Sequence, residues 1–274
     1  MKAEYANGEH WSLDDIALDR VEAGRVRERE ELFLLLAGAS FVETASDLYT
    51  RNMVEQFRDD AEVSRWLTHH WEPEELQHGR ALRAYVNRVW PEFDWQQAFD
   101  GFVDEHARSC TTEELERTPG LEMAARCVVE MGTATYYRAL QVLSDEPVLV
   151  RLAGMIQRDE VRHYKHFHRY FNRYNRTERN GRAAVFGALA RRLRVILRSD
   201  VERGSWYPYR FWNPRAARQG REFRRAVART TTLVRRSYPA PMAVKMLLKP
   251  LALPPTLHRL SCGTVKLAQS LILR

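Results

Sequence analysis

Two stretches of this chain share one pattern: Glu75-Leu-Gln-His78 and Glu160-Val-Arg-His163. Three residues along an α-helix advance the chain by about 300° and about 4.5 Å, so the glutamate and histidine of each stretch lie on one face, one turn apart. Each pair can therefore offer a carboxylate and an imidazole to one metal ion. A single Glu-x-x-His is a weak signal, because a Glu-rich helix often contains it by chance.

Two further glutamates lie in apolar stretches that are also predicted to be helical. Glu43 stands in LLLAGASFVETA and Glu130 stands in AARCVVEMGTA, so neither is expected to face solvent. An unpaired buried carboxylate costs free energy, and we therefore expect a cation to neutralise these side chains. With the two motifs they predict a metal site with six ligands: Glu43, Glu75, His78, Glu130, Glu160 and His163.

The spacing of these residues can bring them to one level of four antiparallel helices. Glu43 and Glu75 are 32 residues apart, and Glu130 and Glu160 are 30 apart, which allows half a helix, a turn and half a helix back. The 52 residues from His78 to Glu130 leave room for a long crossover between helices two and three. This pattern predicts an all-α fold, a ferritin-like four-helix bundle with additional C-terminal helices. Oxygen and nitrogen donors without thiolate favour Fe(II) or Mn(II) over structural zinc.

Apolar residues recur at three- and four-residue steps through this part of the chain, and no strand pattern is present. The recurrence predicts four long helices, at residues 31–57, 62–90, 121–143 and 147–174. Pro73 either begins the ligand-bearing part of the second helix or kinks it. A short helix at residues 95–108 is expected in the crossover, followed by a cap at Thr111 or Thr112.

The texture changes after the fourth helix, which divides the chain into a helical metal-binding bundle at residues 1–175 and a basic helical extension at residues 176–274. In the extension, basic helices are expected at residues 183–198 and 221–238. The aromatic run WYPYRFWNP, residues 206–214, is expected to be a loop. Prolines then break the chain into short pieces, at positions 239, 241, 250, 254 and 255.

The composition of the 274 residues is that of a folded protein, with 45% hydrophobic and 29% charged residues. The longest nearly apolar run, Leu32 to Val42, is shorter than the roughly 18 to 20 residues of a membrane-spanning helix, and the N-terminal residues contain no apolar signal region. We therefore expect a cytoplasmic protein. Cys110, Cys127 and Cys262 form no CxxC pair, so any metal is expected to bind carboxylate and imidazole.

Charge is distributed unevenly along the chain. Residues 164–274 carry 25 Lys and Arg against four acidic residues, a net charge of +21, which leaves −14 for residues 1–163. The basic part could steer an acidic acyl carrier protein or contact a membrane surface peripherally. Nucleic acid is disfavoured because no recognised reading module is present. The remaining alternative is that the acidic and basic parts attract each other.

Three segments resemble the soluble acyl-acyl-carrier-protein desaturases. Trp71-Glu-Pro-Glu-Glu75-Leu-Gln-His78-Gly79 resembles their W-x-x-E-E-x-x-H-G segment, and Asp159-Glu160-Val-Arg-His163 resembles their D-E-x-R-H segment. Glu130-Met-Gly-Thr133 matches their E-x-x-T. The resemblance covers about residues 30 to 175.

Carried over position by position, the resemblance implies that the six predicted ligands bind two irons, with Glu75 and Glu160 bridging. Thr133 would place its hydroxyl one turn from Glu130, beside bound oxygen; the alternative is a helix threonine bonded to a backbone carbonyl. Asp159 would accept the remaining N–H of a ligating histidine and fix its tautomer, or it is simply exposed.

The family also implies an O2-dependent oxidase or oxygenase that acts on a long apolar acyl chain. Desaturation of an acyl-carrier-protein thioester is the expected reaction, with a ferredoxin-type electron donor, two Fe ions or alternatively Mn, and a homodimer. A di-iron hydroxylase or N-oxygenase on another substrate is the close alternative. A non-catalytic iron-binding or peroxide-scavenging protein is the alternative from another class.

Four aromatic and thiol residues near the motifs have weaker signals. One interpretation is that Trp71 packs over the site or helps electrons pass, and that Tyr136, Tyr137 and Cys127 line a substrate channel. For each of the four, packing in the core is the simpler interpretation. The chain is shorter than the plant desaturases, and its basic tail lies outside the resemblance. The metal ligands alone do not determine which substrate the protein uses, so the resemblance leaves the identity of the substrate open.

Overall fold

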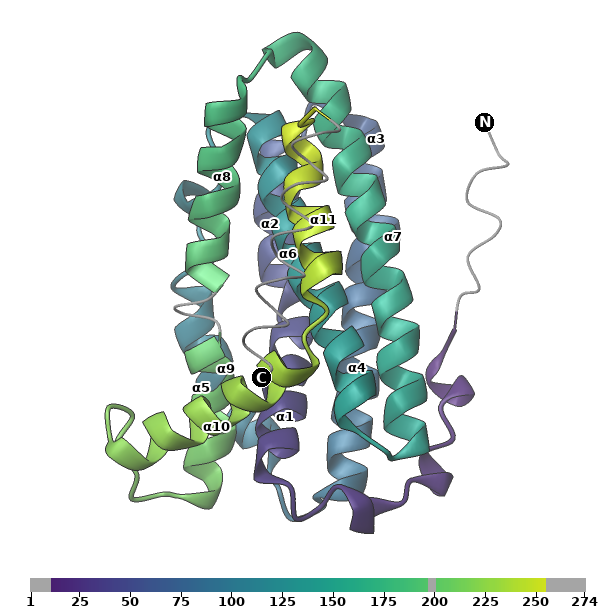
Figure 1. The fold of residues 1–274 in the computed structure, drawn as a ribbon, viewed down its shortest axis with the longest axis vertical. Coiled ribbons are helices and arrows are strands. Elements are labelled where there is room, and N and C mark those ends of the chain that lie inside the picture. The colour runs from purple at the N-terminus through teal and green to yellow at the C-terminus, as the bar shows by residue number, and fades with distance from the viewer. Residues whose placement is uncertain (1–10, 197–200, 255–274) are drawn as a thin grey trace.

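The computed structural model describes residues 11–196 and 201–254, and these residues form an all-α fold without β-strands, as predicted. The helices that carry the predicted ligands, α1, α4, α6 and α7, run side by side along the long axis of the molecule (Figure 1). The helices are α1 (Glu30–Thr44), α2 (Ser46–Gln56), α3 (Ala61–Trp66), α4 (Glu72–Val89), α5 (Trp95–Ala107), α6 (Pro119–Leu143), α7 (Pro147–Glu178), α8 (Arg182–Val195), α9 (Val201–Trp212), α10 (Arg221–Ser237) and α11 (Ala240–Leu248).

The first predicted helix is in fact two helices, because the chain leaves helical geometry at Ala45, with φ −92° and ψ 11°. The break lies where α1 meets α4 at very short range. A Cβ atom added to Gly79 of α4 would lie 2.7 Å from the backbone nitrogen of Thr44, so only glycine permits this approach. The contact sets Glu43, at the end of α1, beside the motif in α4.

The second predicted helix is a continuous helical path whose middle is irregular. α3 passes into a π-helical turn, Leu67–Trp71, and α4 follows at once with Pro73 in its first turn. A proline has no N–H to donate to the preceding turn, and a wider π turn is one way to accommodate that loss. The structure therefore agrees with the first-turn position of Pro73.

The crossover and the third and fourth helices follow the predicted order. α5 occupies the crossover between α4 and α6. The Thr118 hydroxyl accepts a hydrogen bond from the Leu121 N–H and caps α6, whereas Thr111 precedes only a short 3-10 turn and makes no side-chain cap. α7 is capped by Glu146, whose carboxylate accepts from the N–H groups of Val148 and Leu149.

The predicted aromatic loop at 206–214 is wrong, since most of it belongs to α9, which contains Pro208. Pro208 leaves the carbonyl of Gly204 without its helical donor. That carbonyl lies against α1, where a Cβ added to Gly38 would be only 2.8 Å away. Trp206 and Tyr209 are buried in the same core as α1. Packing between distant segments has overridden the local breaker signal.

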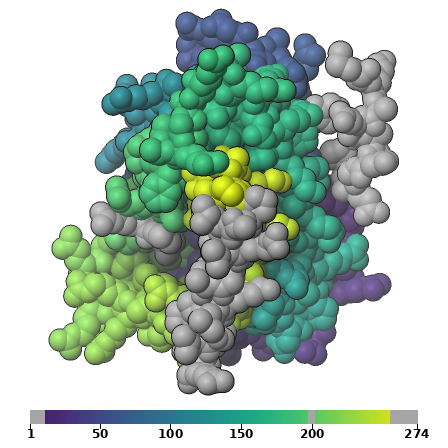
Figure 2. Space-filling model, turned by 45° about the horizontal axis from the view of Figure 1, so that its top comes forward, coloured from purple at the N-terminus to yellow at the C-terminus, as the bar shows by residue number. Residues whose placement is uncertain are grey.

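The helices after residue 175 share cores with the helices before it. α9 and α10 pack with α1, and α8 and α11 pack with α6 and α7. In Figure 1, α10 lies across the lower end of α1, and Figure 2 shows α11 at the surface beside the α7–α8 segment. Pro241 begins α11 and Pro250 lies in a 3-10 turn, as expected of short pieces. Pro255 and Cys262 lie outside the described residues.

Several arginines of the basic part pair with acids of the acidic part. Arg218 lies 2.6 Å from Glu105, Arg229 lies 3.2 Å from Glu31, and the Arg191 guanidinium lies 2.5 Å from Glu116. Such partly exposed pairs contribute about 0 to 1 kcal/mol each. The uneven charge thus serves, in part, contacts within the molecule.

One stretch, Glu30–Gln56, is long and apolar enough by length and composition alone to cross a membrane. Most of its apolar window is buried inside the protein, and the stretch is interrupted at Ala45. These properties are typical of a core helix in a soluble protein.

Candidate metal centre

The six predicted ligands converge at one level of the helical bundle. Their side chains are all buried, between 0% and 7% exposed. Ligand atoms within 4.8 Å of one another form two groups that share Glu75 and Glu160. One group adds Glu43 and His78, and the other adds Glu130 and His163. The four helices therefore bring together two adjacent positions, each with an imidazole, a carboxylate of its own and two shared carboxylates.

Both histidines present the same nitrogen to the centre. His78 Nδ1 lies 3.2 Å from Glu160 Oε1 and 3.6 Å from Glu43 Oε2. His163 Nδ1 lies 2.9 Å from Glu75 Oε1 and 3.5 Å from Glu130 Oε2. The Nδ1 atoms are thus the donors that face the shared carboxylates.

The opposite nitrogen of each ring faces an outer carboxylate on the other motif. His78 Nε2 lies 3.2 Å from Asp159 of α7, and His163 Nε2 lies 2.7 Å from Glu74 of α4. A carboxylate at Nε2 accepts the ring proton there and leaves the Nδ1 lone pair of the neutral ring directed inward. Arg162 joins the two outer acids, with Nη1 2.8 Å from Asp159 and Nη2 2.8 Å from Glu74.

Three of the four inner carboxylates also accept a hydrogen bond from a side chain outside the cluster. The Tyr137 hydroxyl donates to Glu43 at 2.5 Å, and the Thr133 hydroxyl donates to Glu160 at 2.5 Å. The Trp71 indole N–H donates to Glu130 at 3.1 Å. These donors orient the carboxylates and leave their second oxygens for the centre.

Burial and the closeness of several carboxylates shift the pKa values of the cluster residues strongly. Burial and the nearby carboxylates raise the pKa of Glu75 well above its ordinary range, and burial raises the pKa of Glu130 to about 7. Burial disfavours protonation of His78 and His163, but the surrounding carboxylates outweigh it and raise both pKa values. Without a metal, protons neutralise part of this excess negative charge.

The outer acids behave in the opposite way. Burial alone would raise the pKa of Glu74, but His163 and Arg162 outweigh it and hold that pKa at about 2. Burial is likewise outweighed at Asp159, where His78 and Arg162 hold the pKa at about 2. Both outer carboxylates are therefore ionised at neutral pH and can stabilise a cationic centre.

The inner atoms fit a metal because they face one another closely without forming hydrogen bonds. Five buried atoms of the cluster make no hydrogen bond: Glu75 Oε1, His78 Nδ1, Glu130 Oε2, Glu160 Oε1 and His163 Nδ1. Buried polar atoms are nearly always paired, so a group of orphaned donors and acceptors that face one another calls for an occupant. The residues present can hold a metal ion at each of the two positions, through oxygen and nitrogen only.

Three residues of this centre were missed by the sequence reasoning. Glu74 precedes Glu75 as Asp159 precedes Glu160, so alignment of the two motifs offered a signal for it. Arg162 stands inside the second motif and pairs locally with Asp159, three residues earlier, but its contact with Glu74 depends on the fold. Trp11 lies in the N-terminal coil, which is the segment 11–29 before α1 with its three short 3-10 turns, and nothing in the sequence connected it to the site.

Trp11 covers the outer side of the His78 position. Its indole N–H donates to Asp159 at 2.7 Å, and its ring stacks on His78 with centroids 5.9 Å apart. Gln77 donates to the Trp11 carbonyl at 2.6 Å, so the motif in α4 holds the coil in place. The stacked ring shields the imidazole from solvent.

The remaining candidates are placed as follows. The single proton of the Thr133 hydroxyl can go either to Glu160, its nearest acceptor, or to the carbonyls of Val129 and Glu130, which lie 3.3 and 3.2 Å away. Tyr136 donates to the backbone of α1 rather than to the cluster. Cys127 is buried in the core of α6 and α7.

No model of a known protein family matches this chain, and no curated protein matches it.

Proposed function

We propose that this chain is a ferritin-like di-iron protein that uses O2 to oxidise an apolar acyl chain. The observation that carries the proposal is the pair of adjacent positions built from two Glu-x-x-His motifs and two further glutamates. Two iron ions, or manganese in their place, would be held by Glu43, Glu75, His78, Glu130, Glu160 and His163, and would supply the redox chemistry for O2.

The chain's own residues would prepare this centre in three ways. Asp159 and Glu74 would keep the histidines oriented, with Nδ1 available for the metal. The buried surroundings would exclude bulk water and so strengthen every electrostatic interaction inside. The hydroxyl of Thr133, bonded to Glu160 Oε2, would provide a proton donor at the edge of the shared carboxylates.

Desaturation of an acyl-carrier-protein thioester is the reaction we propose, with a ferredoxin-type donor, in a homodimer. Arginines on the exposed face of α10, such as Arg225 and Arg236, offer positive charge for an acidic carrier. The sequence segments that resemble the desaturases support this choice over the hydroxylase and N-oxygenase alternatives.

The test is O2 uptake by iron-loaded protein with reduced ferredoxin, with and without an acyl carrier protein bearing a saturated chain. The proposal expects faster O2 uptake with substrate and a product lighter by two hydrogens. Peroxide turnover that is independent of any acyl compound would contradict it and favour a peroxide-scavenging protein. A product heavier by one oxygen would favour a hydroxylase.

A further inference from the structure

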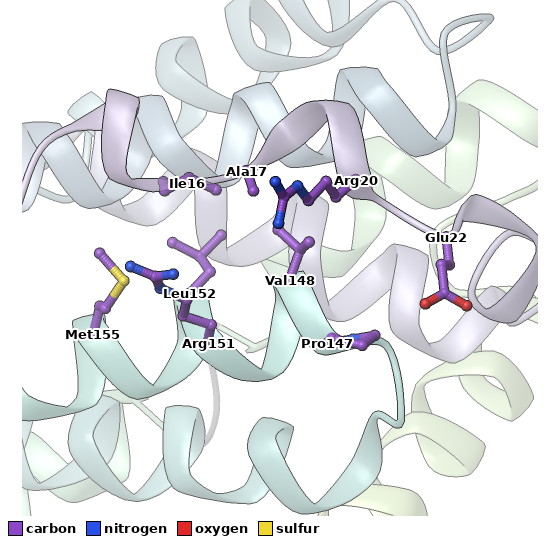
Figure 3. A pocket seen from close by; sticks show the side chains of 9 residues that line it. All are labelled: Ile16, Ala17, Arg20, Glu22, Pro147, Val148, Arg151, Leu152 and Met155. Carbon is purple, nitrogen blue, oxygen red and sulfur yellow. The ribbon is translucent and has the colours of Figure 1, made fainter.

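A pocket of about 290 Å³ lies between the N-terminal coil and the first turns of α7. Its floor is aliphatic, made by Ile16 of the coil and by Val148, Leu152 and Met155 of α7 (Figure 3). These four residues are at most 8% exposed. None of the six proposed metal ligands lines the pocket, so an occupant would be distinct from the metals.

Two guanidinium groups extend over this apolar floor. Arg20 reaches from the coil toward Val148, and Arg151 reaches from α7 alongside Leu152 (Figure 3). In the described part of the chain, no hydrogen bond or ion pair engages either side chain. The acid at the rim, Glu22, is already paired with Arg25 at 2.6 Å. Among the described residues, the pocket therefore combines an aliphatic floor with two exposed guanidinium groups that pair with no acid.

We propose that this pocket binds an amphiphilic anion, a medium-length alkyl chain that ends in an anionic head group such as a carboxylate. The alkyl chain would cover the floor, and the head group would lie between Arg20 and Arg151. At about 30 Å³ for each water-sized group, the volume accommodates roughly ten heavy atoms, which is the size of octanoate. Small-ligand sites commonly combine such an apolar lining with a few polar groups that fix orientation.

Such a ligand would also join the two segments that meet over the His78 position. Ile16 follows Trp11 in the coil, and Met155 precedes Asp159 by one turn of α7. The Trp11–Asp159 hydrogen bond already connects these segments at one end. A bound anion would add a second connection at the other end and hold the coil against α7.

The test is calorimetric titration of the full-length chain with sodium octanoate, without added metal. We expect one saturable site with a Kd of about 1 mM or lower. Octanol, which lacks the charge, should bind at least about fivefold more weakly, and octyltrimethylammonium should not bind. Octyl sulfate should bind like octanoate, because the two arginines recognise negative charge and not the carboxylate alone.

Variants test the contribution of the two arginines separately from that of the apolar cavity. Arg20→Gln and Arg151→Gln should each weaken octanoate binding about three- to fivefold, as expected for partly exposed ion pairs. Ala17→Phe should fill the cavity and abolish binding while both arginines remain. Arg158→Gln, an exposed arginine of α7 outside the pocket, is the matched control and should bind like the wild type.

Equal affinity for octanol and octanoate, or wild-type affinity in the double Arg20→Gln, Arg151→Gln variant, would overturn the proposal. Absence of saturable octanoate binding at millimolar concentration would also overturn it. The titration needs neither iron nor O2, so its failure would leave the proposed di-iron function untouched, and failure of that function would leave this site untouched.

Discussion

At the scale of single residues, each motif of the centre supplies the outer acid that contacts the histidine of the other motif. Each histidine faces inward through Nδ1 and outward through Nε2, and its outer partner belongs to the other motif: Asp159 for His78 and Glu74 for His163. Arg162 contacts both outer acids and so connects the two positions. The arrangement is close to symmetric, and each half can be perturbed by itself.

Neutralising one outer acid should weaken one metal position more than the other. Asp159→Asn should lower metal affinity at the His78 position, and Glu74→Gln should lower it at the His163 position, each by about 10- to 100-fold. Arg162→Gln should weaken both. Titration with Co(II), followed by its visible absorption, measures the two positions. Equal loss at both positions in the Asp159 and Glu74 variants would contradict this assignment.

The buried imidazole of His106, in α5 and outside the metal centre, predicts that folding stability depends on pH. Burial and the charge of Arg203, which donates to His106 Nδ1 at 2.9 Å, lower the pKa of this imidazole to about 4. The unfolded chain, with a pKa near 6.5, binds the proton more readily, so stability is lost as the pH falls from about 6.5 toward 4. At pH 5 the loss is about 2 kcal/mol.

The change His106→Gln keeps an acceptor for Arg203 and removes the titration. Relative to this variant, the wild type should lose about 2 kcal/mol more of its free energy of unfolding between pH 7.5 and pH 5, measured by urea denaturation. Parallel pH profiles for the two proteins would show that the imidazole is not held neutral by the fold.

At the scale of elements, the close contact of α1 with α4 sets the register of the centre. Gly79, directly after His78, lies against the backbone of Thr44, directly after Glu43. The glycine therefore positions two of the predicted ligands, from different helices, at one level. A side chain at this point would have to separate the helices.

Gly79→Ala should lower the free energy of unfolding by about 1 to 3 kcal/mol, because the added methyl group meets backbone atoms that cannot rotate away. Gly132 of α6 is the matched control, since a Cβ there would meet nothing within 4 Å. Gly132→Ala should be neutral or stabilising by up to about 1 kcal/mol. Thermal unfolding measures both, and similar effects of the two substitutions would contradict the role of the contact.

Local signals predicted some elements well and others poorly. The helices at 121–143, 147–174 and 221–238 were predicted within a few residues at most ends, because their apolar period is long and their ends carry caps or prolines. The break at Ala45 and the helix α9 were not predicted. Both lie where glycines allow close contact between distant segments, and such contacts leave no local pattern.

In the candidate site, too, features set by local spacing could be predicted and features set by tertiary contacts could not. The glutamate and histidine of each motif share a helix face through local spacing, so their grouping could be predicted. Trp11, which is 148 residues from Asp159, could not. The roles of these residues toward a metal remain predictions.

At the scale of the whole molecule, the basic helices complete the acidic bundle. Trp206 and Tyr209 of α9 lie in the core of α1, while Val185 and Leu189 of α8 lie in the core of α6 and α7. A chain without these helices would expose apolar surface on α1, α6 and α7. The fold should accordingly behave as one cooperative unit.

We expect thermal unfolding of the full chain to give coincident transitions by far-UV circular dichroism and by tryptophan fluorescence. A chain that ends at Asn175 should lose the sharp transition or aggregate, because its apolar faces remain uncovered. A truncated chain that unfolds sharply at the temperature of the full chain would show instead that residues 1–175 are an independent domain.

The central claim is that six buried side chains hold two metal ions, and metal content tests it most directly. Protein purified after iron-supplemented expression should contain about two irons per chain, and a Glu160→Gln, His163→Ala variant should contain about one or none. Circular dichroism of both proteins confirms that the variant retains its helices. Absence of metal from the wild type, even after anaerobic reconstitution with Fe(II) and with Mn(II), would contradict the account.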